Sequence, residues 1–279
     1  MAAAQQFRRA VARTRLAPVA AFPFRLFRVA KYDARVLRSS ARWLVTSREH
    51  HNYTYELTAL NREHLAWFVS DVCGVPVAKA RGWMAELEAD EALRRHIETT
   101  TAASARRGLA DRSVRYARRA GWYAMIRALG PAHVVETGTD KGLGTCVIAA
   151  ALLRNAAEGR PGRVTSIDIN PEAGYLTRAD PWAAVIDLVI GDSVAVLAGL
   201  TEPVGLFLHD SDHSAAHERR EFTAVEPRLA DGAVLLSDNL TKTDVLPHYA
   251  DATGRRFLAF REQPARHWYP GDGIGAAWR

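Results

Sequence analysis

The sequence predicts an α/β fold in which a doubly wound sheet of seven strands follows a helical N-terminal region. Three observations lead to this prediction. A short β-branched run at 133–135 is followed by spaced glycines, four further apolar runs each end in polar or acidic residues, and two short strands occupy 257–261 and 273–278. Apolar strand patterns that alternate with helical segments are typical of parallel sheets covered on both faces.

The N-terminal segment is strongly basic. Residues 1–48 carry eleven Lys or Arg against one acid, Asp33, interleaved with Phe, Leu and Val. Such a segment suits an anionic membrane surface, a nucleic-acid arm, an organellar transit peptide or a solvated helical face. We favour a solvated helical face or a frayed terminus, with no specific nucleic-acid partner. Because no apolar run approaches the roughly 20 residues of a membrane-spanning helix, we expect no transmembrane segment.

Residues 49–110 have helical patterning. Apolar positions such as Leu65, Phe68 and Val72 recur at helical spacing, and Gly74-Val75-Pro76 interrupts them. The small and polar residues 99–110 suggest a linker or mobile lid. We therefore predict an accessory region at 1–110, whose helices are a candidate homo-oligomer contact, and a second domain at 111–279 that opens with a helix at 115–130.

The glycine-rich segment begins with a predicted buried strand at 133–135, and Glu136 marks its carboxyl end. The acid precedes the first glycine, where it would repel a pyrophosphate but accept hydrogen bonds from a polar, partly cationic ligand. This order favours S-adenosylmethionine over NAD. Glycines allow a tight turn and a close approach to such a ligand before the helix at 145–153. The loop supplies the candidate ligand contacts Gly138, Thr139, Gly142, Gly144 and Thr145.

Three more apolar runs place polar residues at strand ends. Asp168 follows the strand within 163–171, where an acid is placed to hold two ribose hydroxyls. After the strand within 185–193, Asp192 or Ser193 is a candidate contact of an adenine edge. The run at 205–213 ends in the polar cluster HDSDH, in which Asp210 is a further candidate contact of the cofactor. In a parallel sheet these carboxyl ends share one edge, which is where open α/β folds bind ligands.

The last part of the chain helps to distinguish two sheet types. The fifth run, at 232–239, ends in Asp238 and Asn239, and the strands at 257–261 and 273–278 are joined by a hairpin-length connection. A dinucleotide-binding Rossmann domain normally continues with parallel strands. The predicted antiparallel hairpin therefore argues against a dinucleotide-binding Rossmann domain.

The ordered motifs ETGTDKGLG, SIDINP, HDSDH and SDN resemble those of class I S-adenosylmethionine-dependent methyltransferases over roughly residues 112–279. Within that class, they resemble the metal-dependent O-methyltransferases of the catechol, caffeoyl-CoA and macrolide-sugar types. The resemblance implies a divalent cation, such as Mg²⁺, on Asp210, Asp238 and Asn239. It also implies a small hydroxylated acceptor, for example a natural product or sugar.

His213 is the candidate general base, because a histidine takes up a proton near neutral pH and the sugar-modifying relatives place one at a matching position. The catechol-like relatives typically use a lysine nearby, which leaves a phenolic acceptor less favoured. Asp212 is either an alternative metal ligand or a helix cap. His209 and His217 are predicted to be structural. Asp238 and Asn239 also suit a turn without metal.

Two cysteines, Cys73 and Cys146, form neither a disulfide framework nor a metal motif, so we expect a reducing, cytoplasmic setting. Cys146 is predicted to be a core residue. The preferred function is metal-assisted O-methylation of a small metabolite. An NAD-dependent oxidoreductase and a non-catalytic S-adenosylmethionine-binding protein are the alternatives.

Overall fold

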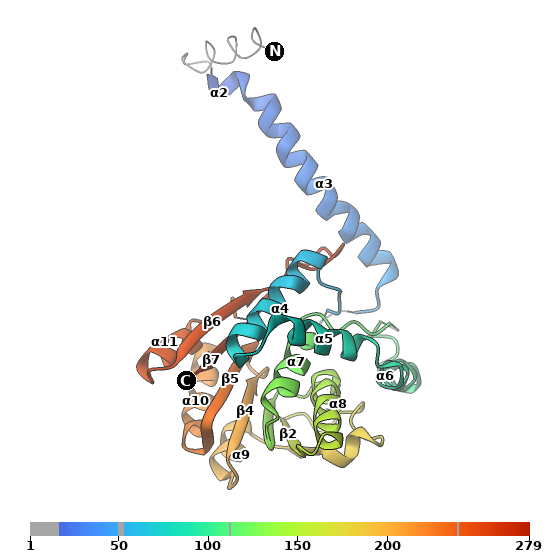
Figure 1. Ribbon diagram of the computed structural model, residues 1–279. Helices are drawn as coiled ribbons and strands as arrows, with labels where there is room; N and C mark the ends of the chain where they lie inside the picture. Colours follow the sequence, from blue (N-terminus) through green and yellow to red (C-terminus); the bar gives the residue numbers. More distant parts are fainter. Residues whose placement is uncertain (1–16, 50–52, 112, 239) are drawn as a thin grey trace. The chain divides into compact units, whose positions relative to one another are not determined.

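The computed structural model describes residues 17–49, 53–111, 113–238 and 240–279. The described chain forms two compact units (Figure 1). One unit contains α2 (Ala17–Ala20), α3 (Phe22–Thr46) and the short segment 266–269. Within it, the ring of Trp43 makes an edge contact with that of Trp268, with 5.3 Å between ring centroids. The other unit contains residues 48–265 and 270–279.

The second unit begins with a helical layer that belongs to the same compact body as the sheet. Its helices are α4 (Ala59–Cys73), α5 (Val77–Glu88) and α6 (Glu91–Ala103). Gly74 ends α4 in the left-handed conformation at φ +63°, as the break in the sequence pattern predicted. Residues 99–103 complete α6, so the prediction of a linker there was wrong for this part. A domain boundary at 110/111 stays a prediction.

The seven predicted strands are present and form one sheet in the order β3-β2-β1-β4-β5-β7-β6. The first five strands run parallel, and β7 is antiparallel to both β5 and β6. The predicted doubly wound sheet with a C-terminal antiparallel pair is thus confirmed. The strands are β1 (His133–Thr137), β2 (Arg163–Asp168), β3 (Ile186–Ile190), β4 (Val204–His209), β5 (Leu229–Asp238), β6 (Arg256–Arg261) and β7 (Gly273–Trp278).

Helices cover the sheet on both faces (Figure 1). An apolar core joins the sheet to α9 (Ser193–Gly199), α10 (Ala215–Val225) and α11 (Val245–Ala252) through residues such as Phe207, Phe222 and Leu246. On the opposite side α8 (Leu143–Ala157) packs against β2 and α7 (Arg119–Leu129). Cys146 is fully buried in α8, as predicted. Two 3-10 turns, η1 (Trp182–Val185) and η2 (Glu226–Arg228), precede β3 and β5.

The topology places a switch point in the middle of the sheet. β1 lies between β2 and β4, so the chain moves outward from β1 in one direction and then in the other. Open α/β folds generally bind ligands at the carboxyl edge beside such a point. The ends of β1, β2, β3, β4 and β5 and the loops that follow them carry the predicted site residues.

Candidate functional site

The three glycines after β1 are required by the protein's own packing. A Cβ on Gly138, whose φ is +90°, would lie 2.0 Å from the carbonyl oxygen of Asp210. At Gly142, where φ is +92°, it would meet Thr177 at 2.6 Å, and at Gly144 it would meet Glu136 at 2.5 Å. The loop after β1 therefore lies directly against the loop after β4. A tight turn and the approach of a ligand were the predicted reasons for these glycines, and the contact between the two loops was not predicted.

Glu136 lies at the end of β1 but is buried inside the fold, with 1% of its surface exposed. Its Oε2 accepts hydrogen bonds from Thr145 Oγ1 at 2.5 Å and Ser166 Oγ at 2.7 Å. Burial raises the pKa of Glu136 to about 7. In this arrangement Glu136 and Thr145 brace β1, β2 and α8 against one another. Their direct contact with a cofactor stays a prediction.

Asp168, at the end of β2, hydrogen-bonds to the glycine-rich loop that follows β1. Its Oδ2 accepts the backbone N–H of Asp140 at 2.8 Å, and its Oδ1 accepts that of Asn170 at 2.8 Å. A carboxylate has about four acceptor positions, so two remain for other donors. Thr139 shares a hydrogen bond with Ser166, 2.7 Å between hydroxyl oxygens. Contact of Asp168 with ribose hydroxyls stays a prediction.

The predicted adenine contacts Asp192 and Ser193 also have structural roles. Asp192 caps α9, because its Oδ1 accepts the backbone N–H of Ala195 at 2.8 Å. Ser193 donates to Oε1 of Glu221 at 2.5 Å. Both residues lie at the carboxyl edge, beyond the end of β3.

Glu221 on α10 is a buried carboxylate that the sequence analysis did not single out. Besides Ser193, four side chains hydrogen-bond to it: Thr137 at 2.8 Å, His209 at 2.7 Å, Ser211 at 2.8 Å and His217 at 2.9 Å. Burial acts to raise the pKa of Glu221, but the hydrogen bond from His209 and its other partners lower that pKa to about 2. This network gives His209 and His217 positions in the structure that suit the structural roles predicted for them.

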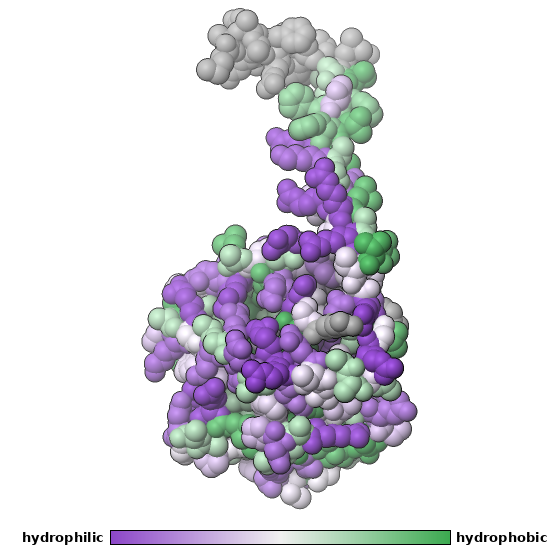
Figure 2. Space-filling model, turned by 90° about the vertical axis from the view of Figure 1, so that its right-hand side faces the viewer, coloured by the Kyte–Doolittle hydropathy of each residue, from purple (hydrophilic) through white to green (hydrophobic). Residues whose placement is uncertain are grey.

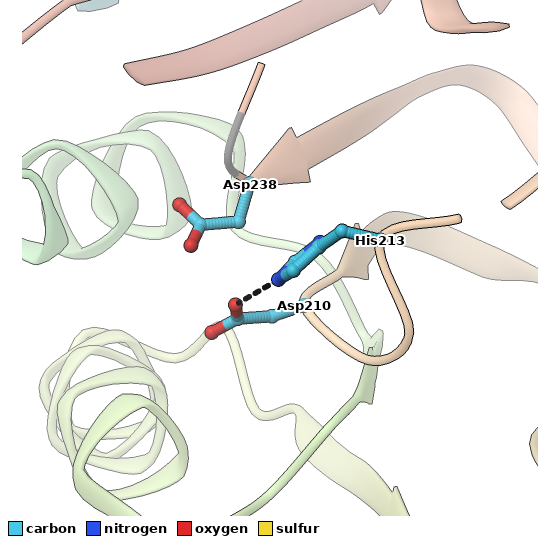
Figure 3. Close-up of side chains that lie close together, drawn as sticks. All are labelled: Asp210, His213 and Asp238. Carbon is cyan, nitrogen blue, oxygen red and sulfur yellow. Dashed lines mark ion pairs between the residues drawn. The ribbon is translucent and has the colours of Figure 1, made fainter. Parts of the chain in front are cut away.

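Three candidate catalytic side chains converge at the ends of β4 and β5 (Figure 3). Asp210 and His213 come from the loop after β4, and Asp238 comes from the last position of β5. One ligand atom from each lies within 4.8 Å of the others. His213 Nε2 is 3.8 Å from Asp210 Oδ1. Asp212 instead faces solvent and accepts the backbone N–H of Ser214 at 2.8 Å. Asn239, predicted as a metal ligand, lies outside the described residues.

Arg118 joins this cluster from the residue just before α7, although the sequence analysis did not select it. Its Nε and Nη2 donate to the two carboxylate oxygens of Asp238, and its Nη1 donates to Glu262 at 3.2 Å. Tyr55 also donates to Glu262, at 2.8 Å. Arg118 and both carboxylates are buried. A fixed guanidinium therefore orients Asp238 and balances part of the negative charge in the site.

The two aspartates of the site differ in acidity. Burial and the charge of Asp238 raise the pKa of Asp210 well above its usual range. Burial acts in the same direction on Asp238, but the charge and hydrogen bonds of Arg118 outweigh it and lower its pKa. Of the two, Asp210 therefore takes up a proton more readily than Asp238. Burial also lowers the pKa of His213, so this histidine is neutral at pH 7.

A second arginine, Arg119, begins α7. Its guanidinium lies over the ring of Trp122, 5.4 Å from the centroid, and its buried Nε has no hydrogen-bond partner among the described residues. Burial lowers the pKa of Lys141, a residue of the glycine-rich loop, and the positive charge of Arg119 lowers it further. Arg119 therefore brings positive charge to the loop after β1.

Comparisons with known proteins agree with this architecture. A methyltransferase-domain family model matches residues 135–240. A search of curated proteins found no match. Among solved structures, the fold is similar to the O-methyltransferase TomG from Streptomyces achromogenes in complex with SAM, at 19% identity and a TM-score of 0.50, covering 68% of this chain and 89% of that one.

Two further structures share the fold. The O-methyltransferase from Bacillus cereus in complex with SAH is 16% identical with a TM-score of 0.51, covering 72% of this chain and 100% of that one. Cofactor-bound Rv0187 from MTB is 21% identical with a TM-score of 0.52, covering 68% of this chain and 89% of that one. The family model thus matches a methyltransferase domain at residues 135–240, and the strand order and the likeness to these solved structures give the chain the class I methyltransferase fold.

Proposed function

We propose that this protein transfers a methyl group from S-adenosylmethionine to an oxygen of a small hydroxylated metabolite, assisted by a divalent cation. The convergence of Asp210, Asp238 and His213 beside the cofactor loop carries the proposal. Two carboxylates and a neutral imidazole suit both a hard cation and the removal of a hydroxyl proton. The solved O-methyltransferases from Streptomyces achromogenes and Bacillus cereus share the fold.

The residues around the crevice fit the cofactor's polar groups. Asp168 has acceptor positions left for ribose hydroxyls, and Asp192 and Ser193 lie where an adenine edge would meet the sheet. The amino-acid end of the cofactor carries a carboxylate. We assign Arg119 to it, because this cation lies at the cofactor loop with a buried, unpartnered Nε. The cofactor supplies an activated methyl group, so the protein's task is to align and deprotonate the acceptor.

Replacing Arg119 with methionine is expected to weaken binding of S-adenosylhomocysteine about tenfold to a hundredfold, the loss of one charge-assisted hydrogen bond. Isothermal titration calorimetry measures this change. 5′-Methylthioadenosine lacks the amino-acid carboxylate, so its affinity should be unchanged in the same variant. Arg219→Met, at an exposed arginine of α10, is the matched control. Equal losses for both nucleosides would contradict the assignment.

The acidic cluster also fits a divalent cation. The charge of Asp238, together with burial, raises the pKa of Asp210, and a divalent cation between two carboxylates would offset this repulsion as a proton does. Asp210 and Asp238 would hold the cation, with Asn239 as the third predicted ligand. A bound cation would lower the pKa of an acceptor hydroxyl. With or without a cation, Arg118 favours the ionised form of Asp238 and holds its carboxylate in place.

Chelation is expected to suppress methyl transfer to a panel of catechol and sugar acceptors, and added Mg²⁺ should restore it. Calorimetric titration of the protein with Mn²⁺ should show one site that is lost in Asp210→Asn, since this change removes a ligand charge. Asp244→Asn, at an exposed carboxylate of the chain, serves as the control. Full turnover in excess chelator, with no metal found by elemental analysis, would leave a metal-free mechanism.

His213 is placed to accept the acceptor's proton. Its neutral form dominates at pH 7 because burial lowers the pKa of the ring. Its Nε2 faces Asp210, so the nitrogen is directed to the region between the two aspartates (Figure 3). The imidazole would take the hydroxyl proton while Asp210 and Asp238 fix the position of the oxygen.

A further inference from the structure

Helix α3 has two chemically different long faces. Its exposed basic residues follow one another at spacings of three or four: Arg28, Lys31, Arg35, Arg38 and Arg42. Residues three and four apart lie on one side of a helix, so these cations form a single stripe. Figure 2 shows hydrophilic side chains along one side of the lower part of this helix and hydrophobic side chains along the other. Near the start of α3 the exposed Phe27, four residues before Lys31, adds an apolar side chain to the basic side.

The other side of α3 is apolar and exposed. Its large side chains are between 39% and 72% exposed, and α3 has no buried residue. They are Phe22, Leu26, Val29, Val36, Leu37 and Leu44. A contiguous apolar surface of this kind on a protein usually marks an interaction site, because its exposure to water is unfavourable.

Charge complementarity decides between the occupants of this face. Helix α3 carries six Lys or Arg and the single acid Asp33. A nucleic acid would neutralise the cations but leave the apolar face in water. A second copy would cover the apolar face but leave the basic stripe, on the opposite side of the helix, without an oppositely charged partner. An anionic lipid surface satisfies both faces at once, because its acyl region takes the apolar side chains and its headgroups pair with the cations.

We propose that α3 binds in the plane of an anionic membrane surface, with its apolar face inserted and its basic stripe at the headgroups. Its 25 residues give a helix of about 37 Å at 1.5 Å per residue. Among the described residues, no helix is long and apolar enough to cross a membrane. The combination of a charged face, an aromatic and aliphatic face and modest overall hydrophobicity is typical of interfacial helices.

The acidic residue Asp33 lies within the apolar row of α3 and allows a further test of the membrane proposal. It falls between Val29 and Leu37 in the apolar row, four residues from each, and is exposed. A carboxylate at this position opposes insertion, both by its desolvation and by repulsion from anionic headgroups. Removing its charge should therefore strengthen lipid binding, whereas a solvated helical face would show no such response.

Co-sedimentation of the full-length protein with vesicles tests the proposal. Phosphatidylcholine vesicles that contain phosphatidylglycerol should bind the protein, at least tenfold more strongly than phosphatidylcholine alone, and salt should weaken this binding. Leu37→Glu should reduce the affinity roughly tenfold or more, and Asp33→Asn should increase it. Leu60→Glu on α4, at a leucine that is 62% exposed, is the matched control.

Calorimetric affinity for S-adenosylhomocysteine, unchanged in these variants, verifies that the methyltransferase domain is folded. Absence of binding to anionic vesicles would overturn the proposal. So would a concentration-dependent dimer, seen by analytical ultracentrifugation, that Leu37→Glu dissociates while vesicle binding stays the same. Retention of nucleic acid with no response to Leu37→Glu would assign the basic stripe to a nucleic-acid partner instead.

Discussion

Replacing Arg118 with methionine is expected to lower the free energy of unfolding by about 3–5 kcal/mol, the usual loss when one partner of a buried ion pair is removed. Arg118 donates to both oxygens of Asp238 and to Glu262, and no more than a tenth of its side-chain surface is exposed. Methionine fills a similar volume but leaves two buried carboxylates without their cation. The loss is therefore mainly electrostatic.

Urea denaturation at pH 7 measures this change. Arg81→Met is the control, because Arg81 pairs with Glu63 at the surface, where water screens both charges. The double variant Arg118→Met with Asp238→Asn should recover part of the loss, since it removes a charge that the single variant leaves unpaired. A loss in Arg118→Met no greater than that in Arg81→Met would show that the buried pair contributes little to stability.

His213→Ala is expected to lower the rate of methyl transfer about 10² to 10⁴-fold, the usual contribution of a positioned general base. Affinity for S-adenosylhomocysteine should be unchanged, because His213 faces the aspartates of the site. Calorimetric titration with Mn²⁺ distinguishes a general base from a metal ligand. If His213 is only a base, His213→Ala keeps the wild-type affinity for Mn²⁺. If His213 is a ligand, the variant loses that affinity.

His248→Ala is the appropriate control, since its side chain is 71% exposed on α11. His217 is unsuitable, because it hydrogen-bonds to the buried Glu221 and its removal would disturb that network. A His213→Ala enzyme that retains the wild-type rate from pH 6 to 9, with methyl transfer rate-limiting, would contradict the assignment.

The sheet was predictable because strands carry strong local signals. Each parallel strand is an apolar run that ends in polar residues, and the short connection before β7 predicted the antiparallel pairing. The positions of Asp168, Asp210 and Asp238 at one edge follow from this topology. The glycine-rich loop was also recognisable, although the reason for its glycines was not: it depends on the distant carbonyl of Asp210.

The residues that the sequence did not reveal act over long separations in the chain. Arg118 meets Asp238 across 120 residues, and no local pattern records such a contact. One signal was nevertheless present. Arg118 and Arg119 stand at the N-terminal end of α7, where the helix dipole disfavours cations, so another interaction must hold them there. Glu221 lies in the charged segment HERRE, a pattern that is typical of solvent-exposed residues. In the structure, however, Glu221 lies on the inward side of α10 and is buried.

The place of β7 in the sheet affects the order in which the protein is assembled. β7 is the last strand in sequence, yet it lies between β5 and β6, and all six of its residues are buried. β6 cannot pair before β7 is in place, because its only neighbour in the sheet is β7. Until then the edge of β5 is open as well. Docking of β7 therefore closes two strand edges in one step, and a chain in which β7 is not yet docked presents both edges for pairing with other chains.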